Sequence, residues 1–221
     1  ITPAREVGGD FYDYFQLDNE HLGIVIADVS GKGVPAALFM AITRTLLKST
    51  AAFVTAPSPC IRRLNDLLAA ENEQMMFVTV FYGVLHLPTG ELRYVNAGHN
   101  PPYLLSAQTG DDKPVRTLPR TGGVAVAVSE EFPYQEGIIT LQPGDRLFLF
   151  TDGVTEAFNA EQQEFGDKRL EATLQQQLTA SIAPEDLSRA VLQSVRAFEN
   201  GAPQADDITC VSLLYRGDAH R

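Results

Sequence analysis

Residues 23–33 read GIVIADVSGKG and join a run of apolar residues to an aspartate, followed by a loop of serine, lysine and two glycines. The run over residues 21–28 is rich in Ile and Val, which indicates a buried strand that ends on Asp28. The Gly-Lys-Gly segment at 31–33 then turns the chain toward Pro35, at a first helical position where proline is favoured. The stretch predicts a strand, a short loop and a helix, with a carboxylate where the strand ends.

Apolar residues that recur every three or four positions predict four helices. The first covers residues 34–47 and is expected to bury one face, formed by Leu38, Ile42 and Leu46. A second begins at Ser58, and two more are expected over residues 167–178 and 184–198. The predicted core faces of these three helices are Ile61, Leu64 and Leu68, then Leu170, Leu174 and Leu178, then Leu187, Val191 and Val195.

Between residues 75 and 149 the pattern changes to short β-rich segments broken by turn signals, which indicates an antiparallel meander. The predicted strands are 77–87, 91–95, 103–105, 137–141 and 146–151, with a last strand at 208–215. Helices come in pairs and strands come in runs, so strict alternation with a parallel sheet is disfavoured. We predict the α+β class, with antiparallel sheets and helices layered outside them.

The composition indicates one globular domain with a strongly acidic surface. The chain has 221 residues, is 44% hydrophobic and contains no linker-like stretch, so we expect one domain over residues 1–216 and a tail at 217–221. Its net charge of −11 argues against nucleic acid or an anionic membrane as a partner. Phosphate chemistry on this chain would need local positive charge, from arginine or from bound cations.

Cysteine usage and the apolar stretches favour a cytoplasmic protein. The sequence has two cysteines, Cys60 and Cys210, far apart and outside any CxxC motif. The longest apolar helical stretch, residues 34–47, contains Arg44 and is too short to span a bilayer. Because the sequence starts at Ile1 without methionine, we expect a sensor or receiver domain upstream in a longer polypeptide.

Four aspartates share a position at strand ends. Asp28 and Asp152 each end an apolar strand, Asp206 precedes the last strand, and Asp10 begins the segment GGDFYDYF. In an antiparallel sheet the end of one strand lies beside the start of its neighbour, so two terminal and two initial aspartates can converge on one edge. Four carboxylates meeting there would repel one another strongly.

Two interpretations of these aspartates are open. Each aspartate by itself could begin a turn, the commonest role of Asp beside Gly. Four together favour a divalent-cation site, and carboxylate oxygens with no His or Cys nearby suit Mg²⁺ or Mn²⁺ better than zinc. Two such ions would offset the four charges and supply the positive field that the acidic chain otherwise lacks.

Five motifs in one order then suggest a family. They are PAREVGGDFYDYF at 3–15, ADVSGKGVPAALFM at 27–40, NAGHNPPYLL at 96–105, FTDGVTEAFN at 150–159 and DDITCVSLLY at 206–215. With these motifs the chain resembles the metal-dependent protein phosphatases (PPM family), specifically the bacterial SpoIIE/RsbU branch, over about its whole length. The resemblance implies two antiparallel sheets sandwiched between helices, with two Mn²⁺ or Mg²⁺ ions at one edge.

The resemblance also implies the roles of individual residues. Asp10 and Asp28 would contact the metals, and Val29 would lend its backbone carbonyl. Asp152 and Asp206 would complete the shell of the second ion. A water that bridges two divalent ions is acidic enough to be hydroxide near neutral pH, so it would be the nucleophile, and no protein nucleophile is required.

Four further residues have two interpretations each. Asp207 is the adjacent alternative to Asp206, which we prefer because it aligns with the aspartate before the Asn-Met-Thr of distant relatives. Arg5 has a spacing similar to the phosphate-binding arginine of eukaryotic relatives, but can equally be a solvated charge. Lys32 either meets the substrate or solvates a turn. His99 is either a general acid or substrate contact, or a structural residue in its Gly/Asn/Pro turn.

The implied function is hydrolysis of a phosphoserine or phosphothreonine on a regulatory protein. In the SpoIIE/RsbU branch that protein is usually an anti-anti-sigma (STAS-domain) factor in a partner-switching pathway. The alternative is a non-catalytic interaction module with the same fold. We also expect the helical pair at 34–71 to be the place where an upstream domain or a second copy of the chain, in a homodimer, acts on Asp28, because the pair directly follows it.

Overall fold

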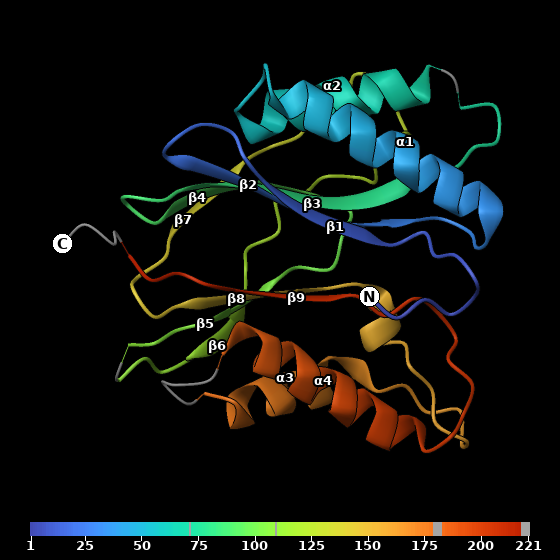
Figure 1. Ribbon diagram of the computed structural model, residues 1–221, viewed down its shortest axis with the longest axis vertical. Helices are drawn as coiled ribbons and strands as arrows, with labels where there is room; N and C mark the ends of the chain where they lie inside the picture. Colours follow the sequence, from blue (N-terminus) through green and yellow to red (C-terminus); the bar gives the residue numbers. More distant parts are fainter. Residues whose placement is uncertain (71, 109, 179–182, 218–221) are drawn as a thin grey trace.

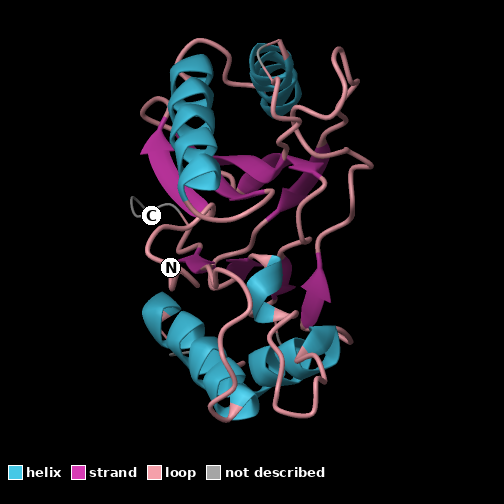
Figure 2. Cartoon of the chain, turned by 90° about the vertical axis from the view of Figure 1, so that its right-hand side faces the viewer, coloured by secondary structure: helices cyan, strands magenta, loops and turns pink. Residues whose placement is uncertain are grey.

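The computed structural model describes residues 1–70, 72–108, 110–178 and 183–217, so most of the predicted tail lies outside the described residues. Two antiparallel sheets are stacked face to face, and two helices cover the outer face of each sheet (Figure 1). Figure 2 shows the same layers from the side, with helices above and below the strands. The α+β class and the sandwich of two sheets between helical layers are therefore confirmed.

The first sheet has the strand order β1-β2-β3-β4-β7, and its central strands are buried on both faces. Ile24 and Ile26 of β2 pack toward the second sheet, whereas Val25 and Ala27 pack under the helices. The strands are β1 (Phe11–Gln16), β2 (His21–Val29), β3 (Val78–His86), β4 (Glu91–Ala97) and β7 (Gly137–Thr140). Strand β1 was not predicted, because its sequence FYDYFQ has aromatic residues on both faces and so lacks the apolar-polar alternation of a half-buried edge strand.

The second sheet has the order β6-β5-β8-β9, which corrects the prediction of one continuous meander. After β4 the chain leaves the first sheet through Gly98, which has a φ of +75°, and two prolines that cannot donate to a strand ladder. Strands from residues 75–149 are thereby divided between the sheets. Those of the second sheet are β5 (Tyr103–Leu105), β6 (Val115–Thr117), β8 (Arg146–Phe150) and β9 (Cys210–Leu214).

Three of the four α-helices begin with proline in the first turn. The helices are α1 (Val34–Ala51), α2 (Pro57–Ala69), α3 (Gly166–Gln176) and α4 (Pro184–Glu199), and a short 3₁₀ helix η1 covers Asp152–Val154. The predicted inward faces of α2 and α4 are buried as expected: Ile61, Leu64, Leu68, Leu187, Val191 and Val195. None of the helices in the described part of the chain has the length and apolarity that a membrane span requires.

The predicted core face of α1 is wrong at Leu38 and Ile42, whereas Leu46 is partly buried against the core. Leu38 is 62% exposed and Ile42 is 51% exposed, while Ala36 and Leu47 are buried. The Ala36 methyl lies only 3.4 Å from the position that a Cβ would take at Gly9, so small residues allow this end of the helix to lie close on the strands. The three-to-four-residue spacing found an apolar stripe, but its N-terminal part, at Leu38 and Ile42, faces outward.

Candidate metal centre

Each sheet brings two of the four predicted aspartates to the same end of the sandwich. In the first sheet Phe11 pairs with Ala27, which puts Asp10 beside Asp28. In the second sheet Phe150 pairs with Cys210, so the segments that carry the other two aspartates leave and enter adjacent strands. Thr151, the residue before Asp152, donates a hydrogen bond to the Asp10 carboxylate at 2.7 Å, so the two pairs face each other. The antiparallel-edge argument therefore places the four residues in one region.

Asp10 joins the two sheets. Its side chain is buried, and one carboxylate oxygen, Oδ2, accepts hydrogen bonds from Thr151 Oγ1 at 2.7 Å and from Thr209 Oγ1 at 2.6 Å. Both threonines belong to the second sheet's motifs, so the contact fixes the spacing between the sheets at this end. Burial raises the pKa of Asp10, and the two hydroxyl donors oppose that rise. Sequence reasoning missed these threonines, although each stands within three residues of a predicted ligand.

Asp28 is the most crowded carboxyl group of the site. It lies beside Asp10, because the two residues directly adjoin the paired residues Phe11 and Ala27. Burial raises the pKa of Asp28 most, and the negative charges of Asp10 and Asp152 raise it further. A site of this kind favours any positive charge that can neutralise it, a proton or a metal cation.

Three glycines allow the segments to approach closely. A Cβ at Gly153 would collide with the backbone oxygen of Asp207, and one at Gly8 would collide with the Asp207 carboxylate. At Gly9 a Cβ would lie 3.1 Å from the Val29 carbonyl oxygen, the atom predicted as a metal ligand. Because these glycines of GGD and TDG have no side chain, the ligand-bearing segments can lie this close to one another.

Asp206 and Asp207 have different environments. The Asp207 carboxylate accepts hydrogen bonds from the backbone N–H groups of Ala4, at 2.7 Å, and Gly9, at 2.8 Å. It therefore anchors the N-terminal segment against the second sheet. The Asp206 side chain is 36% exposed and acts by its charge on Asp28 and Asp152. Of the two, Asp206 has the carboxylate that remains accessible to an ion.

The four carboxylates are the kind of ligand that Mg²⁺ or Mn²⁺ binds, although their oxygen atoms do not converge on one point. Among the residues described, no three His, Cys, Asp or Glu side chains form a ready metal cluster. Asp206 is turned toward Lys32, with Oδ2 2.8 Å from Nζ, and the Asp10 carboxylate accepts hydrogen bonds from Thr151 and Thr209. All four carboxylates are hard oxygen donors of the kind that Mg²⁺ and Mn²⁺ prefer.

Comparison with known proteins agrees with this arrangement. The sequence model described as Stage II sporulation protein E (SpoIIE) matches residues 18–216. The chain belongs to the SpoIIE family. The predicted membership of the SpoIIE/RsbU branch of the PPM phosphatases is thereby confirmed, on a match that starts after Asp10 and includes the other three aspartates.

Individual relatives of this SpoIIE-family chain extend the match. It is 32% identical to Protein IcfG of Synechocystis over 240 aligned positions, which cover 96% of the chain and 37% of the relative. It is 34% identical to the phosphoserine phosphatase RsbU of Bacillus subtilis over 155 positions, covering 70% of the chain and 45% of the relative. The chain thus spans less than half the length of these curated relatives.

Solved structures support the fold. The SiaA-PP2C domain of Pseudomonas aeruginosa superposes with a TM-score of 0.82 at 23% identity, covering 98% of this chain and 84% of that one. At this identity the likeness concerns the fold, and it agrees with the two stacked sheets and the outer helices described above.

Two basic residues of this SpoIIE-family chain lie beside the acidic set. Lys32 Nζ is 2.8 Å from Asp206 Oδ2. Arg5 is exposed, and its Nη1 lies 4.0 Å from the position of a Cβ at Gly33, at the end of the loop that carries Lys32. Both predicted substrate contacts therefore lie near the carboxylates, where a phosphate would need positive charge.

His99 lies in the interior. Its ring is 2% exposed, and its Nδ1 is 2.8 Å from Thr79 Oγ1, in the strand that pairs with β2. Burial lowers the pKa of His99 to about 4, so the ring is neutral at pH 7. This placement argues against the general-acid and substrate-contact interpretation and favours the structural alternative.

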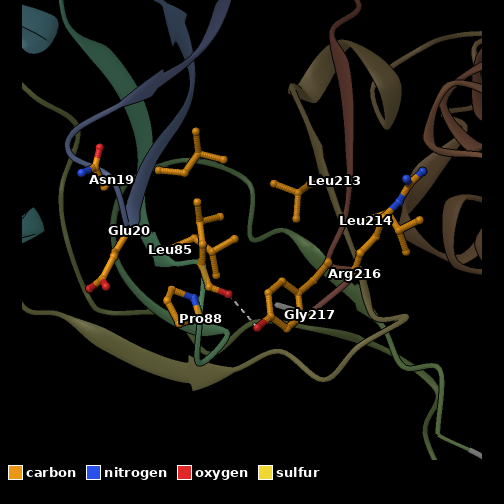
Figure 3. A pocket seen from close by; sticks show the side chains of 11 residues that line it. Asn19, Glu20, Leu85, Pro88, Leu213, Leu214, Arg216 and Gly217 are labelled. Atoms are coloured by element: carbon orange, nitrogen blue, oxygen red, sulfur yellow. Dashed lines mark hydrogen bonds between the residues drawn. The ribbon is translucent and has the colours of Figure 1, made fainter. Parts of the chain in front are cut away.

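A large pocket of about 610 Å³ opens at the opposite end of the sandwich (Figure 3). Its lining includes Leu22, Leu85 and Leu213, and Tyr215 donates a hydrogen bond to the Leu87 carbonyl at 2.9 Å beside it. It lies at the start of β2, whereas Asp28 lies near the end of that strand. The pocket is therefore separate from the candidate metal centre.

Proposed function

We propose that the chain is a Mg²⁺- or Mn²⁺-dependent serine/threonine phosphoprotein phosphatase. The observation that carries this proposal is the convergence of Asp10 and Asp28 from one sheet with Asp152 and Asp206 from the other. Membership of the SpoIIE family and likeness to a relative named phosphoserine phosphatase support it. Two bound divalent ions would acidify a water for attack on phosphorus and would neutralise charge on the phosphoryl oxygens.

The protein groups would have distinct parts in this reaction. Asp10, Asp28, Asp152, Asp206 and the Val29 carbonyl would bind the ions. Thr151 and Thr209 hold the Asp10 carboxylate through hydrogen bonds of 2.7 and 2.6 Å, so this ligand is oriented before an ion arrives. Arg5 would approach the phosphate from the exposed side, with a guanidinium that matches its oxygens.

We propose a phosphorylated STAS-type anti-anti-sigma protein as the substrate, and a cytoplasmic location, by extension from the SpoIIE/RsbU branch. An upstream regulatory domain or a second copy of the chain would act through α1 and α2. Val34, Leu38 and Ile42 supply an exposed apolar stripe for such a contact, on the helix that follows the Asp28 loop. A contact that shifts α1 would also shift this loop, and with it the Asp28 carboxylate near the end of β2.

The test is metal-dependent release of p-nitrophenol from p-nitrophenyl phosphate, followed by release of phosphate from a phosphorylated STAS protein. We expect turnover with Mn²⁺, none with EDTA, and a loss of at least about a hundredfold in Asp28→Ala and Asp152→Ala. Asp112→Ala, on an exposed loop, is the matched control and should keep full activity. Absence of metal-dependent turnover in the unmodified chain would favour the non-catalytic interaction module.

A further inference from the structure

Lys32 connects the two sheets across the edge of the candidate metal centre. Its Nζ lies 2.8 Å from Asp206 Oδ2 and also donates a hydrogen bond to the Ala205 carbonyl at 2.5 Å. The lysine belongs to the loop that follows Asp28, whereas Asp206 precedes β9. The contact is therefore a long-range tie between the segments that carry two of the proposed ligands.

The surroundings of the lysine are acidic. Burial raises the pKa values of Asp152 and Glu156, and the charge of Lys32 opposes that rise in both. Side-chain exposures of 38% for Lys32 and 36% for Asp206 mean that the pair is half-shielded from water. The ammonium group contacts the Ala205 carbonyl and the Asp206 carboxylate, both about 170 positions away along the chain, so it does more than solvate its own turn.

The loop around Lys32 is tied to the first sheet at Ser30, whose N–H donates to the Phe77 carbonyl at 2.9 Å and whose Oγ accepts from the Phe77 N–H at 2.9 Å. Gly31 and Gly33 have φ values of +87° and +79°, and a Cβ at Gly31 would meet nothing within 4 Å. Helix α1 begins directly after this loop and has no side-chain cap at its N-terminus. The contacts of the Lys32 ammonium group are thus a main tie between the start of α1 and the second sheet.

We propose that Lys32 is a positioning residue that competes with a divalent cation for the Asp206 carboxylate, so that cation binding releases the loop at the start of α1. An ammonium group and a divalent cation need the same oxygen lone pairs of Asp206, and both cannot bind Oδ2 at short range. The inference rests on the proposed function, because it takes Asp206 to be a metal ligand. It assigns Lys32 a role different from direct substrate contact.

The experiment is calorimetric titration of the metal-stripped chain with Mn²⁺. We compare the unmodified chain, Lys32→Gln, Lys32→Arg and the control Lys168→Gln, whose lysine is exposed on α3. Removing the competing charge should tighten Mn²⁺ binding in Lys32→Gln by about three- to tenfold. Lys32→Arg, which keeps the charge, should stay within about twofold of the unmodified chain, as should Lys168→Gln.

A second readout separates competition from a merely structural role. Without metal, Lys32→Gln should melt below the unmodified chain, and saturating Mn²⁺ should remove the difference, because the lysine no longer holds Asp206 in the loaded chain. A lower melting temperature both with and without Mn²⁺, at unchanged affinity, would overturn the inference alone. Failure of the unmodified chain to bind Mn²⁺ would overturn the proposed function as well.

Discussion

Asp10 and Asp28 lie side by side at the end of the β1–β2 ladder, next to the paired residues Phe11 and Ala27. Asp10 is buried and Asp28 is half-buried, and Asp152 and Asp206 of the second sheet add negative charge that raises the pKa of Asp28. The arrangement costs stability in the absence of a cation, because a buried carboxylate and its half-buried neighbour repel each other. It is also what gives the site affinity for a divalent ion, so stability and metal binding should respond in opposite directions to neutralisation.

Asp28→Asn should therefore stabilise the metal-free chain while abolishing its response to metal. The pKa of Asp28 is raised on folding, so its contribution to stability is lost as pH rises above the unfolded value. At pH 7.5 the neutral amide should raise the free energy of unfolding by about 1–3 kcal/mol. Urea unfolding in EDTA and in excess Mn²⁺ measures both effects.

Asp112→Asn is the control for this measurement, because it removes one negative charge from an exposed loop. It should leave both the unfolding free energy and the gain from Mn²⁺ unchanged within about 0.5 kcal/mol. If Asp28→Asn proved as stabilised by Mn²⁺ as the unmodified chain, Asp28 would not be a ligand.

Substitution at the two adjacent aspartates should separate ligand from anchor. Asp207→Ala leaves the N–H groups of Ala4 and Gly9 without their acceptor, and should cost roughly 2–4 kcal/mol of stability in EDTA. Asp206→Ala removes a half-exposed ion pair and should cost less than about 1 kcal/mol there. Mn²⁺ titration should show binding severely weakened in Asp206→Ala. The reverse assignment of costs would contradict the distinction.

Gly153→Ala should damage both stability and metal binding, because the new methyl would push apart the segments that carry Asp152 and Asp206. We expect a loss of more than about 2 kcal/mol in urea unfolding. Gly122→Ala is the control: Gly122 has a φ of +76° but open space around it, so only backbone strain of about 1 kcal/mol is expected. Equal costs at the two positions, with Mn²⁺ affinity retained, would show that close approach at Gly153 is not required.

Most of the fold could be predicted from the spacing of apolar residues. Strands β2 and β3 are continuous apolar runs, and helices α2 and α4 have apolar residues every three or four positions. Strand β1 was missed since its outward residues include Tyr12 and Tyr14, which remain 40% and 69% exposed. Two sheets were expected, but which strands belong to which sheet was not predicted. Periodicity describes each strand locally, and pairing depends on the direction that a turn such as the one at Gly98 gives the chain.

The candidate site was predictable where its residues stand at strand ends in an antiparallel arrangement. Asp10, Asp28, Asp152 and Asp206 could be grouped in this way from the amino-acid sequence alone. The anchoring by Asp207 and the orientation of Asp10 by Thr151 and Thr209 could not, because such contacts join residues about 140 to 200 positions apart. The spacing of residues along the chain does not indicate which hydroxyl group donates to which carboxylate.

His99 should make the chain sensitive to acid. Its pKa is lowered to about 4 in the folded protein, so its contribution to stability is present above the unfolded value near 6.5 and is lost as pH falls toward 4. Between pH 7 and 5 this group should account for a loss of about 2 kcal/mol. Urea unfolding of His99→Gln across that range should show a shallower dependence on pH than the unmodified chain. Parallel curves would mean that the ring is protonated in both states alike.

The outward stripe of α1 gives a direct test of the corrected helix orientation. Leu47 is 1% exposed and Leu38 is 62% exposed, although both are leucines of one helix. Leu47→Ala should cost about 2–5 kcal/mol, because it leaves a cavity under the helix. Leu38→Ser should change the free energy of unfolding by less than about 0.5 kcal/mol, since its side chain already meets water. Matched urea curves for the two variants decide the point: a large cost at Leu38 would show that α1 buries the face formed by Leu38, Ile42 and Leu46 after all.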